Sequence, residues 1–442
     1  MTFCLADAES MCLLATRLDE AAGEITRLQG ASVSVGLPIT APAELAHYER
    51  PLRDLVEWCH SSAADLRRRA AVAAQADLID REPFGGKATY DALKTAAAGG
   101  VDTELAAFDA LSPDGDAAAF FAGLAPGRGL AVAMARASQV GARAGVPFEL
   151  RFAANRHLVC LAHAEALRTG DQAAAQRYTK LLAPDRRLLL FDVRGAGRIA
   201  EVKGDLNTAV SVAIMVPGTG SNLANFDAGP VSDMRTLHTF ADQRARGTVA
   251  TIMWLGAEMP PNVGAAALDL YADRGAPKLR DFVAGLGLPG EVRTTLIGHS
   301  YGSTLTGHAV RAGLHPDNLV AVASPGWGVD HVTELRAPTT SLFAVRHPHD
   351  FISVIPSLED GVRGAGLPAP SSIGHGNDPI LMRHVTRLAS GYDDAFLQGG
   401  FDLAAHSDYF GGEGRARTAT NNLARVVTGE DPVTFDEARK AL

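Results

Sequence analysis

The sequence predicts an α/β fold with a mostly parallel sheet, preceded by an all-helical N-terminal region. Two observations lead to this prediction. From Arg187 onward, short apolar runs typical of strands buried on both faces alternate with helical segments. Before that point, apolar residues recur at helical spacing and no strand pattern is found. We therefore expect two domains, a helical one at 1–182 and an α/β one at 183–442.

The bulk composition fits an ordinary globular protein. The chain has 442 residues, more than one average domain, with 47% hydrophobic and 21% charged residues. The formal net charge of −9 argues against a nucleic-acid-binding protein, which normally presents a basic face. We expect no nucleic acid partner.

The four cysteines carry no recognisable chemistry. Cys4, Cys12, Cys59 and Cys160 all lie early in the chain and have no C-x-x-C spacing. A disulfide framework, a cysteine nucleophile and a thiolate zinc site are therefore not indicated, and we expect these residues to be small buried apolar groups.

The N-terminus predicts no targeting segment. It lacks a basic stretch followed by an apolar one, and no apolar run is long enough to span a membrane. We expect a cytoplasmic protein, with export without a cleaved signal peptide as the alternative.

The first domain reads as helices throughout. An amphipathic helix is predicted from Ala6 to Gln29 and a second long one from Glu44 to about Leu78, which together would form an antiparallel hairpin. Ala-rich helical segments separated by Gly and Pro continue to Leu182. None of them carries a catalytic motif, so packing or partner binding is the expected role.

The second domain begins with a predicted β-hairpin, Leu188 to Val193 and Arg198 to Lys203, around two glycines. Buried strands follow, separated by helical segments, and a terminal helix is predicted from Ala416 to Thr428. This alternation indicates parallel strands with right-handed crossovers. The predicted strands are Val210–Val216, Thr248–Leu255, a strand ending before Gly298, Leu319–Ala323 and Thr340–Arg346.

The most informative stretch is Gly298-His299-Ser300-Tyr301-Gly302, which lies between an apolar strand and a small-residue helix. A Gly-x-Ser-x-Gly turn in this position is the nucleophile elbow of the α/β-hydrolase fold. The elbow strains the serine backbone, and glycines are needed on either side because a Cβ there would collide with neighbouring chain. Ser300 is therefore the predicted nucleophile.

A serine hydroxyl needs a base, and the base needs a third group to orient it. In this fold the chain order is Ser, then Asp or Glu, then His. Asp350 follows an apolar strand and is the predicted acid, although a turn-capping role is the alternative; Asp330 and Glu334 are weaker substitutes.

His406, in the loop before the terminal helix, is the predicted base, because in this order the base usually comes from the last loop. His375 and His384 are its competitors.

The oxyanion of the intermediate needs amide donors. One should be the backbone N–H of Tyr301, after the nucleophile, and the other that of Thr219 in Pro217-Gly218-Thr219-Gly220, which follows a strand. The histidine typical of that loop in lipases is missing. No cofactor is predicted. His347 and His349 are spaced like metal ligands, but no further ligand completes a zinc set, so no metal is predicted.

With these residues in view, the chain resembles an uncharacterised family of α/β hydrolases from high-GC bacteria with a helical N-terminal extension. The resemblance spans about Arg187 to Gly429. It rests on Val216–Gly220, Gly298–Ser303, Ser324–Gly326, His349-Asp350 and His406–Tyr409. It implies the fold and the catalytic residues and leaves the substrate open. The N-terminal hairpin is also similar to small helical proteins of WXG-type secretion systems, but it lacks the Trp-x-Gly turn between its helices.

The sequence thus predicts a serine hydrolase, esterase- or lipase-like, that acts on a small-molecule ester or lipid through an acyl-enzyme. Gly361 to Pro370 is expected to serve as a lid, and Trp327 with Phe351 to line an acyl pocket. The alternative is that the helical region is the functional part, binding a protein partner or serving secretion, with a degenerate hydrolase domain.

Overall fold

The computed structural model describes residues 7–34, 42–82, 85–112, 115–348, 350, 352, 375–391, 404–414 and 416–440. The chain divides into two compact units. The first comprises Met1–Ala137 and Cys160–Ala175, and the second comprises Ser138–Val159 and Gln176–Leu442. The predicted boundary at 182 stays a prediction.

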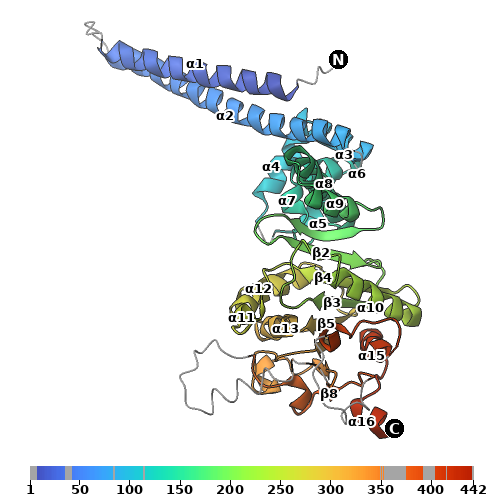
Figure 1. The fold of residues 1–442 in the computed structure, drawn as a ribbon. Coiled ribbons are helices and arrows are strands. Elements are labelled where there is room, and N and C mark those ends of the chain that lie inside the picture. The colour runs from blue at the N-terminus through green and yellow to red at the C-terminus, as the bar shows by residue number, and fades with distance from the viewer. Residues whose placement is uncertain are drawn as a thin grey trace. The chain divides into compact units, whose positions relative to one another are not determined.

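The first unit is helical. Its longest elements are α1 and α2, which pack against each other over much of their length (Figure 1). Three further helices, α7, α8 and α9, contribute residues to both units. The helices before the sheet are α1 (Ala8–Ser34), α2 (Pro42–Arg81), α3 (Lys87–Ala97), α4 (Asp102–Ala110), α5 (Ala117–Ala122), α6 (Pro126–Ala135), α7 (Ala137–Val140), α8 (Phe148–Thr169) and α9 (Gln172–Leu181).

The first half of α8, which belongs to the second unit, is held against the first strand of that unit by two buried side chains. Asn155 donates its side-chain amide to the carbonyl of Leu188 at 3.0 Å, and Arg151 donates to that of Leu189 at 3.2 Å. Both carbonyls belong to the first strand. Burial lowers the pKa of Arg151 to about 10, and its guanidinium is held by backbone carbonyls.

The second unit contains a mostly parallel sheet with the strand order β1-β2-β4-β3-β5-β6-β7-β8. Only the pairs β1–β2 and β2–β4 are antiparallel. The strands β3, β4 and β6 are buried at every residue, as continuous apolar runs predict. The strands are β1 (Arg187–Asp192), β2 (Arg198–Lys203), β3 (Ser211–Val216), β4 (Val249–Leu255), β5 (Arg293–His299), β6 (Asn318–Val322), β7 (Ser341–Val345) and β8 (Thr386–Arg387).

Helices cover both faces of the sheet (Figure 1). α12 and α13 pack together on one face, and α10 and α15 pack together on the other. The helices of this unit are α10 (Pro230–Ala245), α11 (Val263–Ala266), α12 (Leu270–Ala284), α13 (Tyr301–Arg311), α15 (Ala416–Thr428) and α16 (Phe435–Lys440). The predicted α/β-hydrolase architecture with a helical N-terminal region is confirmed.

The strand register brings the segments of interest to one edge of the sheet. Val216, the last residue of β3, pairs with Gly298 near the end of β5, and Val322 pairs with Val345 at the ends of β6 and β7. The loops that follow β3, β5 and β7 therefore leave the sheet side by side, at the carboxyl ends of parallel strands.

One strand and one cysteine differ from what the sequence predicts. The short strand β8 is not predicted from the sequence. Cys59 and Cys160 are buried, but Cys12 is exposed, so its predicted burial is wrong.

Within the described ranges, no helix has the length and apolar character needed to cross a membrane.

Candidate active site

The turn between β5 and α13 holds Ser300 in a strained conformation. Its φ is 53° and its ψ is −129°, a left-handed region that non-glycine residues rarely adopt. A Cβ on Gly298 would collide with the backbone of Ser303, and one on Gly302 with the carbonyl of Val216. Both glycines are therefore required by close approach of neighbouring chain.

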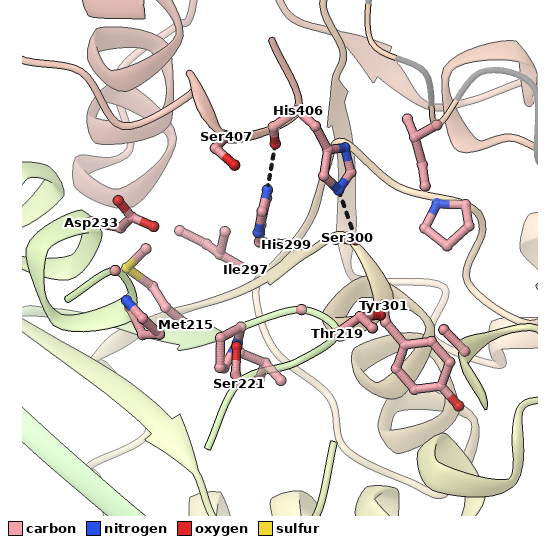
Figure 2. A pocket seen from close by; sticks show the side chains of 18 of the residues that line it. Met215, Thr219, Ser221, Asp233, Ile297, His299, Ser300, Tyr301, His406 and Ser407 are labelled. Carbon is pink, nitrogen blue, oxygen red and sulfur yellow. Dashed lines mark hydrogen bonds between the residues drawn. The ribbon is translucent and has the colours of Figure 1, made fainter. Parts of the chain in front are cut away.

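Ser300 begins a chain of hydrogen bonds through His406 to Asp350. The hydroxyl of Ser300 lies 2.9 Å from Nε2 of His406 (Figure 2), and Nδ1 of that ring lies 2.8 Å from Oδ1 of Asp350. Because an ionised carboxylate only accepts, Nδ1 carries the proton and Nε2 is free to accept from the serine. Loops after β5, β7 and the segment before α15 thus bring together the three residues predicted from the sequence.

Asp350 is fully buried and well supplied with donors. Oδ2 accepts a hydrogen bond from the hydroxyl of Tyr409 at 2.6 Å, and Oδ1 accepts one from the N–H of Ile352 at 2.9 Å. Burial alone would raise the pKa of Asp350, but the bonds from His406, Tyr409 and Ile352 outweigh it and hold the pKa below its ordinary value. The carboxyl is therefore ionised at neutral pH.

Tyr409 is a residue whose role the sequence does not reveal. Its fully buried hydroxyl also accepts from the N–H of His347 at 2.8 Å, and its ring stacks on that imidazole with centroids 4.0 Å apart. Its position three residues after His406 is the one sequence feature that could have identified it as part of the site. Tyr409 thus links the segments that carry Asp350 and His406.

His299 supports the position of His406 through a hydrogen bond to its backbone. Its Nε2 lies 2.9 Å from the backbone carbonyl of His406, so this nitrogen carries the proton and donates (Figure 2). Burial lowers the pKa of His299 to about 4, and the ring is neutral at physiological pH. A neutral ring adds no charge beside the imidazole of His406.

The loop after β3 passes next to Ser300. An added Cβ on Gly218 would lie 2.7 Å from the Cβ of Ser300. The loop is fixed by the N–H of Gly220, which donates to the carbonyl of Pro260 at 2.7 Å, and by the side-chain amides of Asn222 and Asn225, which donate to the carbonyl of Gly220. These two asparagines are not predicted; asparagine after a Gly-rich loop is a signal too common to single them out.

Two backbone donors remain available at this point. Tyr301 is the first residue of α13, so its N–H has no intrahelical acceptor. Neither this N–H nor that of Thr219 donates to another residue in the part of the chain that the structure describes. The phenol of Tyr301 points away: it donates to the carbonyl of Leu268, just before α12, and accepts from the N–H of Ala272 in that helix.

A cavity of about 510 Å³ opens on Ser300, His406, Thr219 and Tyr301. Most of its wall is apolar. The large apolar side chains in the wall include Met215, Met253, Val263, Ile297, Ile352 and Phe410. An acidic residue, Asp233 in the first turn of α10, also lies in this wall, and burial raises its pKa to about 7.

The competing candidates lie elsewhere or have other partners. Nδ1 of His375 lies 3.0 Å from the hydroxyl of Thr304, and burial lowers its pKa to about 4. His384, Asp330 and Glu334 are exposed.

Of the residues expected around the substrate, Trp327 is fully buried and is not among those that line the cavity. His349, Phe351 and the predicted lid at Gly361–Pro370 lie outside the described residues.

Among the described residues, one group of side chains has the spacing needed to hold a metal ion. Asp269, Asp273 and His308 place ligand atoms within 4.8 Å of one another, and none of them is among the residues that line the cavity. Nδ1 of His308 already lies 2.7 Å from the Asp273 carboxylate, which occupies this ring nitrogen. We assign no metal to this group.

Comparison with known proteins agrees with the fold. Residues 192–360 match a family model described as alpha/beta hydrolase. An uncharacterised protein of Mycobacterium bovis is 32% identical over 205 residues, which cover 44% of this chain and 74% of that protein. The chain belongs to the α/β-hydrolase family. An uncharacterised protein of Mycobacterium tuberculosis matches this family member with the same identity and coverage.

Solved structures match this chain at lower sequence identity. The Francisella virulence factor BioJ is 12% identical with a TM-score of 0.33, and the match covers 62% of this chain and 95% of that one. Esterase LipW from Mycobacterium marinum is 12% identical with a TM-score of 0.30, covering 62% and 94%.

Proposed function

We propose that this α/β-hydrolase family member is a serine hydrolase that cleaves carboxylic esters through an acyl-enzyme on Ser300. The observation that carries the proposal is the hydrogen-bonded series Ser300, His406 and Asp350 behind a serine with a φ of 53°. The turn that holds Ser300 would then be a nucleophile elbow. The family relation supports the hydrolase class.

In the first half-reaction, Oγ of Ser300 attacks the ester carbonyl carbon while His406 Nε2 takes the hydroxyl proton. Asp350 stabilises the imidazolium and fixes the ring through Nδ1. When the tetrahedral intermediate collapses, the bond to the alcohol oxygen breaks and His406 returns its proton to that oxygen. Water, activated by the same imidazole, then hydrolyses the acyl-enzyme and restores the serine.

The negative charge of the tetrahedral intermediate needs preorganised donors. The N–H groups of Tyr301 and Thr219 suit this role, because both border the cavity at Ser300 and neither has an acceptor among the described residues. Each such donor is worth about a hundredfold or more in rate. The apolar wall of the cavity suits the hydrocarbon part of an ester.

The proposal is tested with the full-length chain and p-nitrophenyl butanoate, hexanoate and octanoate. We expect turnover, and we expect Ser300→Ala and His406→Ala to lower kcat by about a thousandfold or more. Ser232→Ala, at an exposed site on α10, and His384→Ala are matched controls that should keep wild-type rates. No turnover of any ester by the folded chain, or turnover that survives Ser300→Ala, would refute the proposal.

The alternative function, partner binding by the helical region, draws on one observation. Leu13, Leu14 and Trp58 on α1 and α2 are each at least half exposed, which is unusual for large apolar side chains. Exposed apolar groups suit a partner surface. This alternative does not require a degenerate hydrolase domain, and the two functions can coexist in one chain.

A further inference from the structure

The cavity beside Ser300 contains a carboxyl group that the proposed reaction does not use. Asp233 lies in its wall, within a mostly apolar surface that includes methionine, isoleucine and valine side chains. A carboxyl group in apolar surroundings is costly unless it is hydrogen-bonded. Its presence in a substrate cavity therefore calls for a partner.

The other ionisable groups in the wall have partners within the protein. His406 bonds to Ser300 and Asp350, His299 to the carbonyl of His406, and His375 to Thr304. The carboxyl of Asp233, by contrast, makes no hydrogen bond or ion pair with any residue in the described ranges. Among the described residues that line the cavity, it is the one acidic side chain.

Capping of α10 does not account for this carboxyl. Acidic residues are common in the first turn of a helix, where they cap free N–H groups or interact with the helix dipole. The cap position of α10 is Gly229, and no side chain caps the helix. Asp233 is instead partly accessible from the cavity, where burial by surrounding protein raises its pKa to about 7.

The position of Asp233 fits the far end of a substrate chain. In Figure 2, Asp233 and Tyr301 lie at opposite sides of the view, and the side chain of Ile297 lies between them. An ester whose carbonyl is held at Ser300 would run along Ile297 and Met215 before it meets the carboxyl. Apolar contact along the chain and one polar contact at its end would then define the substrate.

We propose that Asp233 is a specificity-determining residue that selects esters whose hydrocarbon chain carries a hydrogen-bond donor, a hydroxyl or ammonium group, at a distance from the carbonyl. The inference rests on the proposed ester hydrolysis at Ser300. A hydroxyl donates to the carboxyl in either protonation state, and an ammonium group pairs with the ionised form. A terminal carboxylate would be repelled by the ionised form.

The test compares p-nitrophenyl hexanoate and octanoate with the same esters carrying a terminal hydroxyl, ammonium or carboxylate. For at least one chain length, kcat/KM should be about tenfold higher with hydroxyl or ammonium than with a methyl end, and lowest with carboxylate. Asp233→Leu should bring the ratios close to one. Asp233→Asn should keep the hydroxyl preference and lose the ammonium preference, which separates the two donor types.

Ser232→Ala, the exposed neighbour in the same helical turn, is the matched control and should keep the wild-type ratios. Labelling of Ser300 by a fluorophosphonate shows that each variant is folded. Equal rates for all chain ends in the wild type, or a preference that survives Asp233→Leu, would overturn the inference while leaving ester hydrolysis intact.

A binding measurement separates this inference from the proposed function. In the Ser300→Ala chain, methyl 8-hydroxyoctanoate should bind about tenfold more tightly than methyl octanoate, and Asp233→Leu should remove the difference. If no ester is hydrolysed, the proposed function fails, but this comparison still decides whether Asp233 selects a donor. Equal affinities would overturn the inference.

Discussion

Removing the hydroxyl of Tyr409 should destabilise the second unit and weaken the proposed active site together. In Tyr409→Phe the ring can still stack on His347, but Oδ2 of Asp350 loses a donor and the N–H of His347 loses its acceptor. A hydrogen bond to a charged group contributes about 1.5–3 kcal/mol, and a buried N–H left unpaired costs about 1–3 kcal/mol. Because the two effects share one atom and are not additive, we expect a loss of about 3 kcal/mol in the free energy of unfolding.

Urea unfolding followed by tryptophan fluorescence measures this loss, because Trp254 and Trp327 are fully buried in the second unit. Tyr178→Phe is the matched control. Its ring is also buried, but its hydroxyl bonds to no described residue, so it should cost less than about 1 kcal/mol.

Ester kcat/KM should fall about tenfold in Tyr409→Phe, since Asp350 keeps its bond to His406 but loses one of its donors. A double-mutant cycle with Asp350→Asn should show coupling of at least about 1 kcal/mol. A stability loss equal to that of Tyr178→Phe, or no coupling with Asp350, would refute the assignment of Tyr409 as a positioning residue.

Three further predictions concern the close approach of Gly218, the charge of Asp350 and a buried histidine. Gly218→Ala places a Cβ 2.7 Å from the Cβ of Ser300, so fluorophosphonate labelling should slow at least about tenfold in a folded chain; unchanged labelling would contradict the close approach. Asp350→Asn removes the charge that stabilises the imidazolium, so kcat on p-nitrophenyl hexanoate should fall about a thousandfold or more, and a loss under tenfold would count against the role of Asp350. Burial lowers the pKa of His157 to about 4, so between about pH 6.5 and pH 4 this imidazole binds more protons in the unfolded chain than in the folded one; the loss of stability on going from pH 7 to pH 5 in urea unfolding should therefore be about 2 kcal/mol smaller in His157→Gln than in the wild type, and an equal loss would be inconsistent with a neutral buried ring.

The sequence predicts the fold well where the signal is local. The strands β3 and β4 are continuous apolar runs, and the turn at Ser300 is identified by glycines whose spacing reflects close backbone approach. The terminal helix α15 has the predicted bounds because its apolar periodicity is strong and breakers flank it. Asp350 and His406 are selected by their order along the chain and their position after strands.

What the sequence does not predict depends on contacts between distant segments. Tyr409 contacts Asp350 across 59 residues, and a buried tyrosine near a loop has no distinguishing local pattern. Asp233 looks like any acidic residue in the first turn of a helix, and only the cavity distinguishes it. Arg151 and Asn155 hold the first half of α8 against β1. The helical periodicity of the sequence does not reveal these partners.

The central claim is that Ser300 is a nucleophile activated by His406. The most direct measurement is to incubate the folded full-length chain with a fluorophosphonate and to locate the adduct by peptide mass spectrometry. One adduct is expected, on Ser300, absent from Ser300→Ala and formed far more slowly in His406→Ala. An adduct on another residue, or a folded chain that stays unlabelled, would contradict the claim.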